Sequence, residues 1–433
     1  MNANPAAVGV VDLDQGVSDL DFGRTADGVA YGEALLLVRS HGEPLATVMV
    51  ELSDGAISAS ELESAVRELP SGAARAEREV DRAEPPFVSV IVPTAGRPER
   101  MAACIGALRA MRYPSFEIVI VDNSPGVPGT REAVAAIAAE DPRVRYVAEP
   151  LPGSSVARNR GIREARADLL AFTDDDVQVD PEWLSWMVEP FLRDGRVGVV
   201  TGLVLPARMD TPEQRWFEEY SGFGKGLEPR LYDLDEHRAP ENLLYPYWGA
   251  AFGSGNSMAF RRGVIEGIGG FDPALGAGSP ARAGADVEAF SHAILEGSRL
   301  AYEPRALCWH DHRTHSAALR RQTFAYGAGF TAILTKSVLR EPRLALEMAR
   351  QLGGAVRGNG DDADAPRELG RLRNQFAMSR AQGTLGVQIG GYLAGPALYL
   401  RSVLWARRHR LNDVLKGERI RDGRTAISLV DEL

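Results

Sequence analysis

The sequence predicts an α/β protein built on a mixed sheet that is flanked by helices. Three short apolar runs carry this prediction: residues 87–93 (FVSVIVP), 117–122 (EIVIVD) and 169–172 (LLAF). Each has the length and the Val/Ile/Leu content of a buried strand, and helix-like segments separate them. Strands that alternate with helices form βαβ units whose strand ends share one edge of the sheet. Acids follow two of the three runs at that edge, so we expect a ligand site there.

Composition sets the broad class. The chain has 433 residues, of which 45% are hydrophobic and 25% charged, which is typical of a folded soluble protein of two or three domains. A net charge of −10 argues against a general nucleic-acid binder. Cys104 and Cys308 are too few for a disulfide framework and favour a reducing cytoplasm. The first residues carry no basic patch before an apolar run, so we expect no signal peptide.

We expect four regions along the chain. Residues 1–70 read as a small α+β unit, with strands at 31–40 and 45–52 and a helix over 58–69 capped by Ser58 or Ser60. Residues 71–86 are charged, rich in alanine and end in two prolines, which is typical of a linker. Residues 87–315 form the main α/β domain, and residues 316–433 a helical extension. The first unit shows no chemistry, so we expect a docking or structural role.

The run at 169–172 ends in Thr173 and three aspartates, Asp174, Asp175 and Asp176. Carboxylates are hard oxygen ligands that suit Mg²⁺ or Mn²⁺ shared with a phosphate group. In an extended segment Asp174 and Asp176 point to one side and Asp175 to the other. We therefore expect Asp174 and Asp176 to face a ligand and Asp175 to make local hydrogen bonds. A solvated acidic turn is the simpler interpretation of these residues alone.

Other phosphate-binding classes lack their signatures. A dinucleotide-binding loop would follow the first strand with G-x-G-x-x-G, but residues 94–99 read TAGRPE, and no P-loop is present. Residues 153–162 (GSSVARNRGI) predict a helix that Ser154 or Ser155 caps and that runs to Ala167. A helix N-terminus favours anions, so Arg158 and Asn159 in its first turns are candidates to reach a diphosphate or a base.

In this order, VSVIVPT, EIVIVD, GSSVARNRGI and LLAFTDDDV resemble the family 2 glycosyltransferases of the non-processive type, which have the GT-A fold. Later motifs extend the resemblance from about Phe87 to about Lys336. It implies that Asp122 accepts from the nucleotide base and that Mn²⁺ or Mg²⁺ binds between Asp176 and the diphosphate, with Asp174 at the ribose or metal. The donor site that it implies comprises Pro93, Thr94, Arg97, Asp122, Arg158, Asn159, Asp174 and Asn256.

The second half of the main domain supplies the acceptor side. The long aromatic segment 210–255 predicts a functional loop, in which we single out Trp248 because the small-residue run GAAFGSGN follows it. Residues 269–273 resemble the GGFD element of the family and place Asp272 on the acceptor side. The family's Gly-Glu-Asp motif reads Gly284-Ala285-Asp286 here. The resemblance implies that Asp286 is the catalytic base, although the first acid is missing.

Residues 310–315 (HDHRTH) hold three of the seven histidines. The spacing alone is a weak zinc pattern. Similar family members place a histidine from this segment on the metal or diphosphate, so His310 is the first candidate ligand and His312 the second. Tyr326 and Gly327, with Arg320 and Arg321 before them, resemble a basic Tyr-Gly element that closes over the site.

Two interpretations stay open for the apolar segment 385–404. Its uninterrupted apolar length is below the roughly 20 residues that a membrane span needs. Four arginines flank it, so it is either a helix on an anionic inner leaflet or a packed helix with a basic end. The processive synthases carry spanning helices and Gln-x-x-Arg-Trp, and neither is visible here. The arginines are Arg401, Arg407, Arg408 and Arg410.

The resemblance implies a metal-dependent, inverting glycosyltransferase of cell-envelope polysaccharide or glycolipid biosynthesis. Its donor would be a UDP-, dTDP- or GDP-linked sugar, and its acceptor a hydroxyl of a glycan, a lipid-linked sugar or a small molecule. We expect a cytoplasmic protein, with contact to the inner face of the membrane as the open extension. The alternative is a non-catalytic sugar-nucleotide or glycan-binding module on a degenerate GT-A fold.

Overall fold

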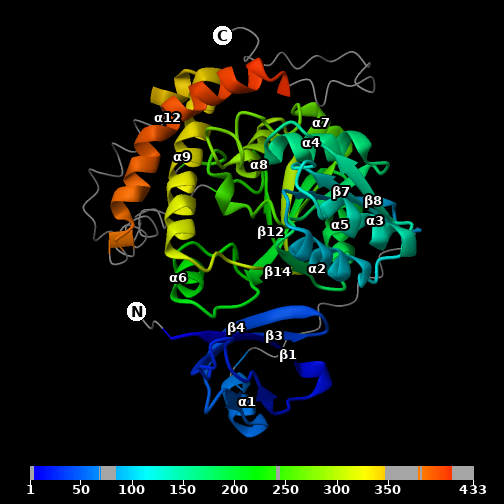
Figure 1. Cartoon of the computed structure of the whole chain (residues 1–433), viewed down its shortest axis with the longest axis vertical. Helices are drawn as coiled ribbons and strands as arrows, with labels where there is room; N and C mark the ends of the chain where they lie inside the picture. Colours follow the sequence, from blue (N-terminus) through cyan, green and yellow to red (C-terminus); the bar gives the residue numbers. More distant parts are fainter. Residues whose placement is uncertain are drawn as a thin grey trace.

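A computed structural model describes residues 4–67, 69, 84–239, 244–346, 379–380 and 383–411. Figure 1 shows a small N-terminal unit beneath a larger α/β domain, with α9 (Ser316–Arg340) and α12 (Leu385–Arg408) along one side. Most of the predicted linker at 71–86 and much of the predicted helical extension at 316–433 lie outside the described residues.

The N-terminal unit is a three-stranded sheet with one helix. β1 (Ala6–Asp12) runs parallel to β3 (Glu33–Ser40), which pairs antiparallel with β4 (Glu43–Glu51). β2 (Leu20–Asp21) and β5 (Ala56–Ile57) form a short pair. α1 (Ala59–Val66) begins after Ser58, one of the two predicted caps, which forms a capping box with Glu61. β4 starts two residues before its predicted start because His41 and Gly42, both at positive φ, complete the turn alone.

The main domain contains one mixed sheet, in the order β10-β14-β11-β13-β9-β6-β7-β8, with β12 paired to β14. The strands β9, β6, β7 and β8 run parallel, whereas β13 is antiparallel to both of its neighbours. The predicted mixed sheet is therefore confirmed. The strands are β6 (Val88–Thr94), β7 (Phe116–Asp122), β8 (Val144–Ala148), β9 (Leu169–Phe172), β10 (Val177–Val179), β11 (Val197–Pro206), β12 (Arg230–Tyr232), β13 (Met258–Arg261) and β14 (Arg299–His310).

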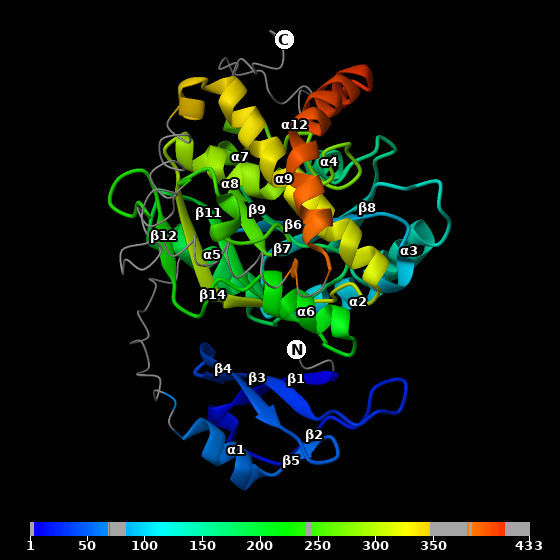
Figure 2. The same cartoon turned by 90° about the vertical axis from the view of Figure 1, so that its left-hand side faces the viewer.

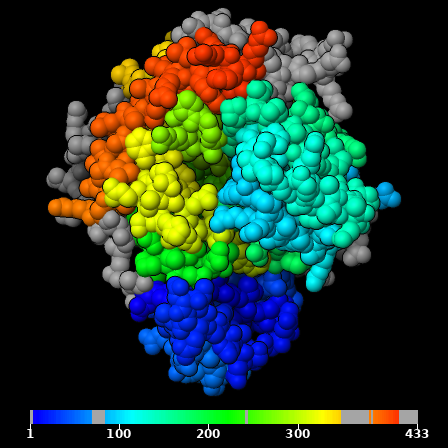
Figure 3. Space-filling view, viewed as in Figure 1, coloured from blue at the N-terminus to red at the C-terminus, as the bar shows by residue number. Residues whose placement is uncertain are grey.

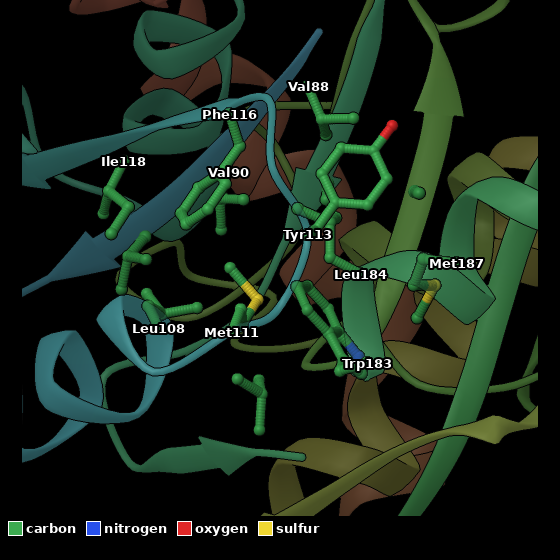
Figure 4. Packing of buried hydrophobic residues seen from close by; sticks show 14 of the residues in the cluster. Val88, Val90, Leu108, Met111, Tyr113, Phe116, Ile118, Trp183, Leu184 and Met187 are labelled. Atoms are coloured by element: carbon green, nitrogen blue, oxygen red, sulfur yellow. The ribbon is translucent and has the colours of Figure 1, made fainter. Parts of the chain in front are cut away.

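Helices cover both faces of this sheet. One core cluster joins it to α2 (Pro98–Arg109), α3 (Thr130–Glu140) and α5 (Trp183–Arg193), and a second joins it to α4 (Ser154–Glu164), α7 (Arg262–Gly267) and α8 (Ala285–Leu295). Figure 4 shows Trp183 and Leu184 of α5 close to Val88 and Val90 of β6. Because water reaches neither face, the inner strands are continuously apolar, and this is the pattern that made them predictable.

Three local predictions are corrected. The residue before α4 is Gly153, at positive φ and with no side-chain cap, so neither Ser154 nor Ser155 caps the helix, which ends at Glu164. Pro93 lies inside β6, because β9 stops opposite Ile91 and leaves one flank of β6 free where proline lacks its N–H. Segment 210–255 is not a single loop. It contains α6 (Pro212–Ser221), whose capping box of Thr211 and Gln214 was visible in the sequence.

The N-terminal unit packs on the main domain at β11 and β14. Leu37 of β3 joins a buried cluster with Leu203 and Leu307. Tyr31 donates to Asp210 at 2.6 Å, and Arg39 pairs with Asp180 at 3.0 Å. Figure 3 shows the surface of this unit meeting that of the main domain.

The helices α9 and α12 cross closely, as the second view shows (Figure 2). Glycines make the approach possible: a Cβ on Gly391 or Gly395 would overlap the backbone of α9 at Phe324 and Ala328. Helices whose backbones approach this closely need small residues at the crossing. Among the described residues, no helix is long and apolar enough to cross a membrane.

We predict that Gly395→Ala destabilises the protein and that Gly390→Ala, one turn away on the same helix, does not. Both changes improve intrinsic helix propensity by up to about 1 kcal/mol. At Gly395 the new methyl meets the Ala328 carbonyl and the Thr331 hydroxyl, and such overpacking costs about 1–3 kcal/mol. At Gly390 the nearest atom is 3.9 Å away. Urea unfolding of both variants measures the difference, and equal stabilities would contradict the close crossing.

Candidate functional site

The aspartate triplet occupies the turn between β9 and β10. Thr173 anchors it by donating to the carbonyl of Asn256 at 2.9 Å. Asp175 is buried and accepts a 2.6 Å hydrogen bond from the hydroxyl of Thr94, at the end of β6. Asp175 thus makes a hydrogen bond, as expected, but its partner lies 81 positions away rather than nearby in the sequence. The triplet is therefore fixed to two neighbouring strand ends.

Asp176 lies among arginines. Its Oδ2 is 3.2 Å from Arg97, 3.5 Å from Arg100 and 3.7 Å from Arg313. Its Oδ1 is 3.5 Å from His310 Nε2. Burial raises the pKa of Asp176, but His310 and the arginines outweigh it, and the net shift is downward. Arg97 was predicted at the site, whereas Arg100 was not, although it follows Arg97 by three residues and so shares its helix face.

Asp174 pairs with Arg158 of α4, at 2.9 Å. Burial raises its pKa to about 6, and the charges of Asp176, Asp175 and Asp286 add to this rise while Arg158 opposes it. The start of α4 is not open to an anion, because Ser154 N–H donates to the Ala277 carbonyl and a Cβ on Gly278 would contact Gly153. Arg158 thus reaches the predicted site through its side chain, and the helix end stays covered.

Two predicted donor-site residues are buried with protein partners. Asp122 accepts from Tyr146 Oη and from the Ser124 amide, both at 2.9 Å. Asn159 exchanges two hydrogen bonds, at 2.8 and 2.9 Å, with the backbone of Phe271. Asn159 therefore holds the GGFD segment in place, and both the nitrogen and the oxygen of its side-chain amide have protein partners.

Asp286 lies in the first turn of α8. Its Oδ2 accepts a 2.7 Å hydrogen bond from the amide of Gly255. A Cβ on Gly255 would lie 2.5 Å from this oxygen, so only glycine permits the approach. The next residue, Asn256, is buried, and its Oδ1 has no hydrogen-bond partner among the described residues. Because the charge of Asp286 raises the pKa of Asp174, the two carboxylates share one electrostatic environment.

The two predicted acceptor-side residues lie in different environments. Trp248 is half-buried, and its ring centroid is 4.6 Å from that of Phe330 on α9. Asp272 pairs with Lys336 of α9 at 2.7 Å, and Lys336 also contacts Glu288 at 2.9 Å. Despite burial, these two carboxylates raise the pKa of Lys336. Glu288 is two residues after Asp286 and so lies on another face of α8. The ion pair between Lys336 and Glu288 therefore connects α9 to α8 without involving Asp286.

The two histidines after β14 form a buried pair. Their Nδ1 atoms are 2.8 Å apart, and Nε2 of His312 is 3.0 Å from Glu218 on α6. Burial lowers the pKa of His310 to about 4, although Asp176 opposes the shift, so the ring is neutral at neutral pH. His312 has protein partners at both ring nitrogens and leaves none for a metal, whereas Nε2 of His310 faces Asp176.

The donor set fits a divalent cation only in part. No three His, Cys, Asp or Glu side chains within the described ranges form a preassembled metal group. Asp174, Asp176 and His310 nevertheless supply oxygen and imidazole donors that Mg²⁺ or Mn²⁺ accepts. Mg²⁺ usually binds through one or two carboxylates and completes its shell with water and substrate phosphates. These residues fit a site of that kind better than a closed protein cage.

Carboxylates, arginines and a histidine meet at the strand ends of this sheet, which places the domain in the class of α/β proteins that bind their ligands at that edge. Comparison with known proteins narrows this class. Residues 89–269 match the family model described as glycosyl transferase family 2. This stretch of the main domain is therefore similar to the family 2 glycosyltransferases, and the predicted GT-A class of fold agrees with the mixed sheet.

Several relatives carry the same assignment. The chain is 25% identical over 228 residues to the pre-mycofactocin glycosyltransferase of Mycobacterium tuberculosis, a match that covers 52% of this chain and 43% of that protein. It is 28% identical over 251 residues to the O-antigen biosynthesis protein RfbC of Myxococcus xanthus, covering 54% and 18%. The chain thus spans less than half the length of these relatives. Among solved structures, the mannosyltransferase PcManGT of Pyrobaculum calidifontis, in complex with GDP-Man and Mn²⁺, has a TM-score of 0.46 at 20% identity, covering 78% and 88%.

We predict that Asp174→Asn stabilises the metal-free protein at pH 7.5 but not at pH 4. A raised carboxyl pKa means that the folded state binds the proton more tightly than the unfolded state does. Wild-type stability therefore falls as the pH rises from about 4 to about 6, and asparagine removes this loss. Since Asp174 is partly exposed, we expect a gain on the order of 1 kcal/mol. Urea unfolding in EDTA at both pH values measures it, and a gain that did not change with pH would contradict the assignment.

Proposed function

We propose that this protein is a metal-dependent, inverting glycosyltransferase that moves a sugar from a nucleoside-diphosphate donor to an acceptor hydroxyl. The observation that carries the proposal is the arrangement of Asp286. It stands at the start of α8, is oriented by the amide of Gly255, and shares an electrostatic environment with Asp174. A carboxylate that is held at a fixed angle beside a phosphate-binding edge suits a general base.

Each group has a role in this reaction. Asp286 takes the proton of the acceptor hydroxyl. At the same time the acceptor oxygen attacks the anomeric carbon of the donor sugar, from the face opposite the departing diphosphate. The side chains of Arg97, Arg100 and Arg313, which now pair with the acids, are the cations that a diphosphate meets. The Oδ1 of Asn256, which has no hydrogen-bond partner within the described ranges, accepts a hydrogen bond from a hydroxyl of the donor sugar. Trp248 borders the acceptor side.

A divalent cation completes the proposed site. Asp176, His310 and Asp174 are the residues that would hold Mn²⁺ or Mg²⁺, which stabilises the negative charge of a leaving diphosphate. The neighbouring carboxylates support this role, because their repulsion adds to the rise that burial causes in the pKa of Asp174, and a cation would relieve that repulsion. The donor sugar is linked to UDP, dTDP or GDP, and cell-envelope polysaccharide or glycolipid synthesis is the expected setting.

We predict that Asp286→Asn lowers release of nucleoside diphosphate from its donor by about 10²–10⁴-fold, because the base is lost. Donor binding stays near wild type. Asp176→Asn should lose both turnover and metal-dependent binding. The measurement is nucleoside diphosphate released from UDP-, dTDP- and GDP-sugars with Mn²⁺ or with EDTA, alongside titration calorimetry for binding. Asp235→Asn, an exposed aspartate away from the site, is the control.

Two outcomes would contradict the proposal. Near-normal turnover by Asp286→Asn would exclude Asp286 as the base. Absence of metal-dependent release from all three donors, with binding intact, would favour the non-catalytic sugar-nucleotide or glycan-binding module.

We also propose peripheral contact with the inner face of an anionic membrane, through α12. Leu393 is 78% and Leu404 66% exposed, and with Ile389 and Leu400 they fall within an arc of about 60° at 100° per residue. The exposed Arg401 and Arg408 flank this stripe. An apolar stripe beside arginines complements the surface of an anionic bilayer. Figure 3 shows α12, in orange and red, at the outer edge of the molecule.

We predict that wild-type protein floats with vesicles of mixed phosphatidylcholine and phosphatidylglycerol, and much less with phosphatidylcholine alone. The double variant Leu393→Glu/Leu404→Glu should lose binding to both, whereas Arg401→Gln/Arg408→Gln should weaken only the anionic case, by about 1 kcal/mol per arginine. Met49→Glu, at an exposed position in β4, is the control. Equal flotation of wild type and the leucine variant would exclude α12 as the contact.

A further inference from the structure

A continuous chain of polar contacts links Glu218 of α6 to the aspartate triplet. Glu218 Oε2 is 3.0 Å from His312 Nε2, His312 Nδ1 is 2.8 Å from His310 Nδ1, and His310 Nε2 is 3.5 Å from Asp176 Oδ1. Carboxylates stand at both ends and two imidazoles lie between them. Of these four residues, Glu218 is the one that no sequence motif pointed to.

The chemistry of the groups gives the chain a direction. An ionised carboxylate only accepts hydrogen bonds, and a neutral imidazole carries one N–H and one bare nitrogen. Glu218 therefore places the proton of His312 on Nε2. The bare Nδ1 of His312 must then accept, so His310 carries its proton on Nδ1. This leaves Nε2 of His310 bare, with its lone pair toward Asp176.

The reverse direction is unfavourable at the outer end. It would set the bare Nε2 of His312 against the carboxylate of Glu218, with two acceptors 3.0 Å apart. In the favoured direction the two facing acceptors are instead His310 Nε2 and Asp176 Oδ1, 3.5 Å apart. A nitrogen lone pair and a carboxylate oxygen that face each other inside a protein suit a cation between them.

Packing holds both rings in place. Phe217 of α6 meets His312 edge to face, with centroids 4.6 Å apart, and Phe223 meets His310 at 5.1 Å. Gln214, one turn before Glu218, donates to the backbone carbonyl of His312 at 3.2 Å. Both histidines are buried. One face of α6 therefore contacts both the ring and the backbone carbonyl of His312.

We propose that Glu218, acting through His312, is a positioning residue that keeps His310 in the tautomer whose bare Nε2 can ligate a divalent cation beside Asp176. The inference rests on the metal site of the proposed function and assigns His312 to orientation rather than to ligation. Outer partners that fix the tautomer of a ligating histidine typically change metal affinity by 10–100-fold when they are mutated.

The test replaces Glu218 by glutamine. The amide of glutamine has the same shape but donates through its nitrogen, so it can reverse the chain and move the proton of His310 to Nε2. We expect Mn²⁺ affinity, measured by electron paramagnetic resonance of the free ion, to fall 10–100-fold. Nitrogen-15 spectra of histidine in the metal-free protein should show a bare Nε2 on His310 in wild type and a protonated one in Glu218→Gln. Glu218→Asp keeps an acceptor and should largely restore the wild-type tautomer.

Glu219→Gln is the matched control, because it removes the same charge from the next residue of α6, where the side chain pairs with Arg215. It should leave both the tautomer and the Mn²⁺ affinity unchanged. The inference is overturned if His310 carries its proton on Nε2 in wild type, or if Glu218→Gln binds Mn²⁺ like wild type. If the tautomers behave as expected while wild type binds no Mn²⁺, the positioning role stands and the metal site of the proposed function fails.

Discussion

The structure depends on offsetting the negative charges of Asp174, Asp175 and Asp176, three adjacent carboxylates at the end of β9. Like charges this close repel strongly in a partly buried site, and each needs a partner there. The partners come from separate elements: Thr94 from β6, Arg97 from the loop before α2, Arg100 from α2, Arg158 from α4 and Arg313 from the segment after β14. The charge cluster therefore exists only when sheet, helices and the later segment are assembled together. The same charges that balance the acids are suited to meet an anionic ligand.

Structural residues and chemical residues are interleaved in the same motifs. In the GSSVARNRGI segment, Arg158 faces Asp174 whereas Asn159, the next residue, clamps the backbone of Phe271. In the GGFD segment, Asp272 joins α8 to α9 through Lys336. These contacts hold α8, whose first turn carries Asp286, against α9. A motif residue can thus serve the site by holding another segment in place, without contacting a ligand itself.

In the histidine segment, too, one residue has a structural role and the other faces the site. His310 and His312 are two residues apart on the chain and look equivalent in the sequence. Their surroundings differ, because α6 supplies a carboxylate to His312 and none to His310. One ring is left with a nitrogen that faces the acids, and the other has protein partners at both nitrogens.

The sequence by itself determined the α/β class, the inner strands and the positions of the acids, because strands buried on both faces must be continuously apolar and the acids interrupt that pattern. It did not reveal β1 or β13, and α6 was overlooked despite its capping signature. Only the tertiary structure decided the partners of each acid, the covered start of α4 and the contact between Glu218 and His312. Such contacts join residues that are far apart in the sequence: Glu218 and His312 are 94 positions apart, and Thr94 and Asp175 are 81 positions apart. Periodicity and local spacing report on neighbours within a few turns, so contacts between distant segments are settled only when the sheet places their ends together.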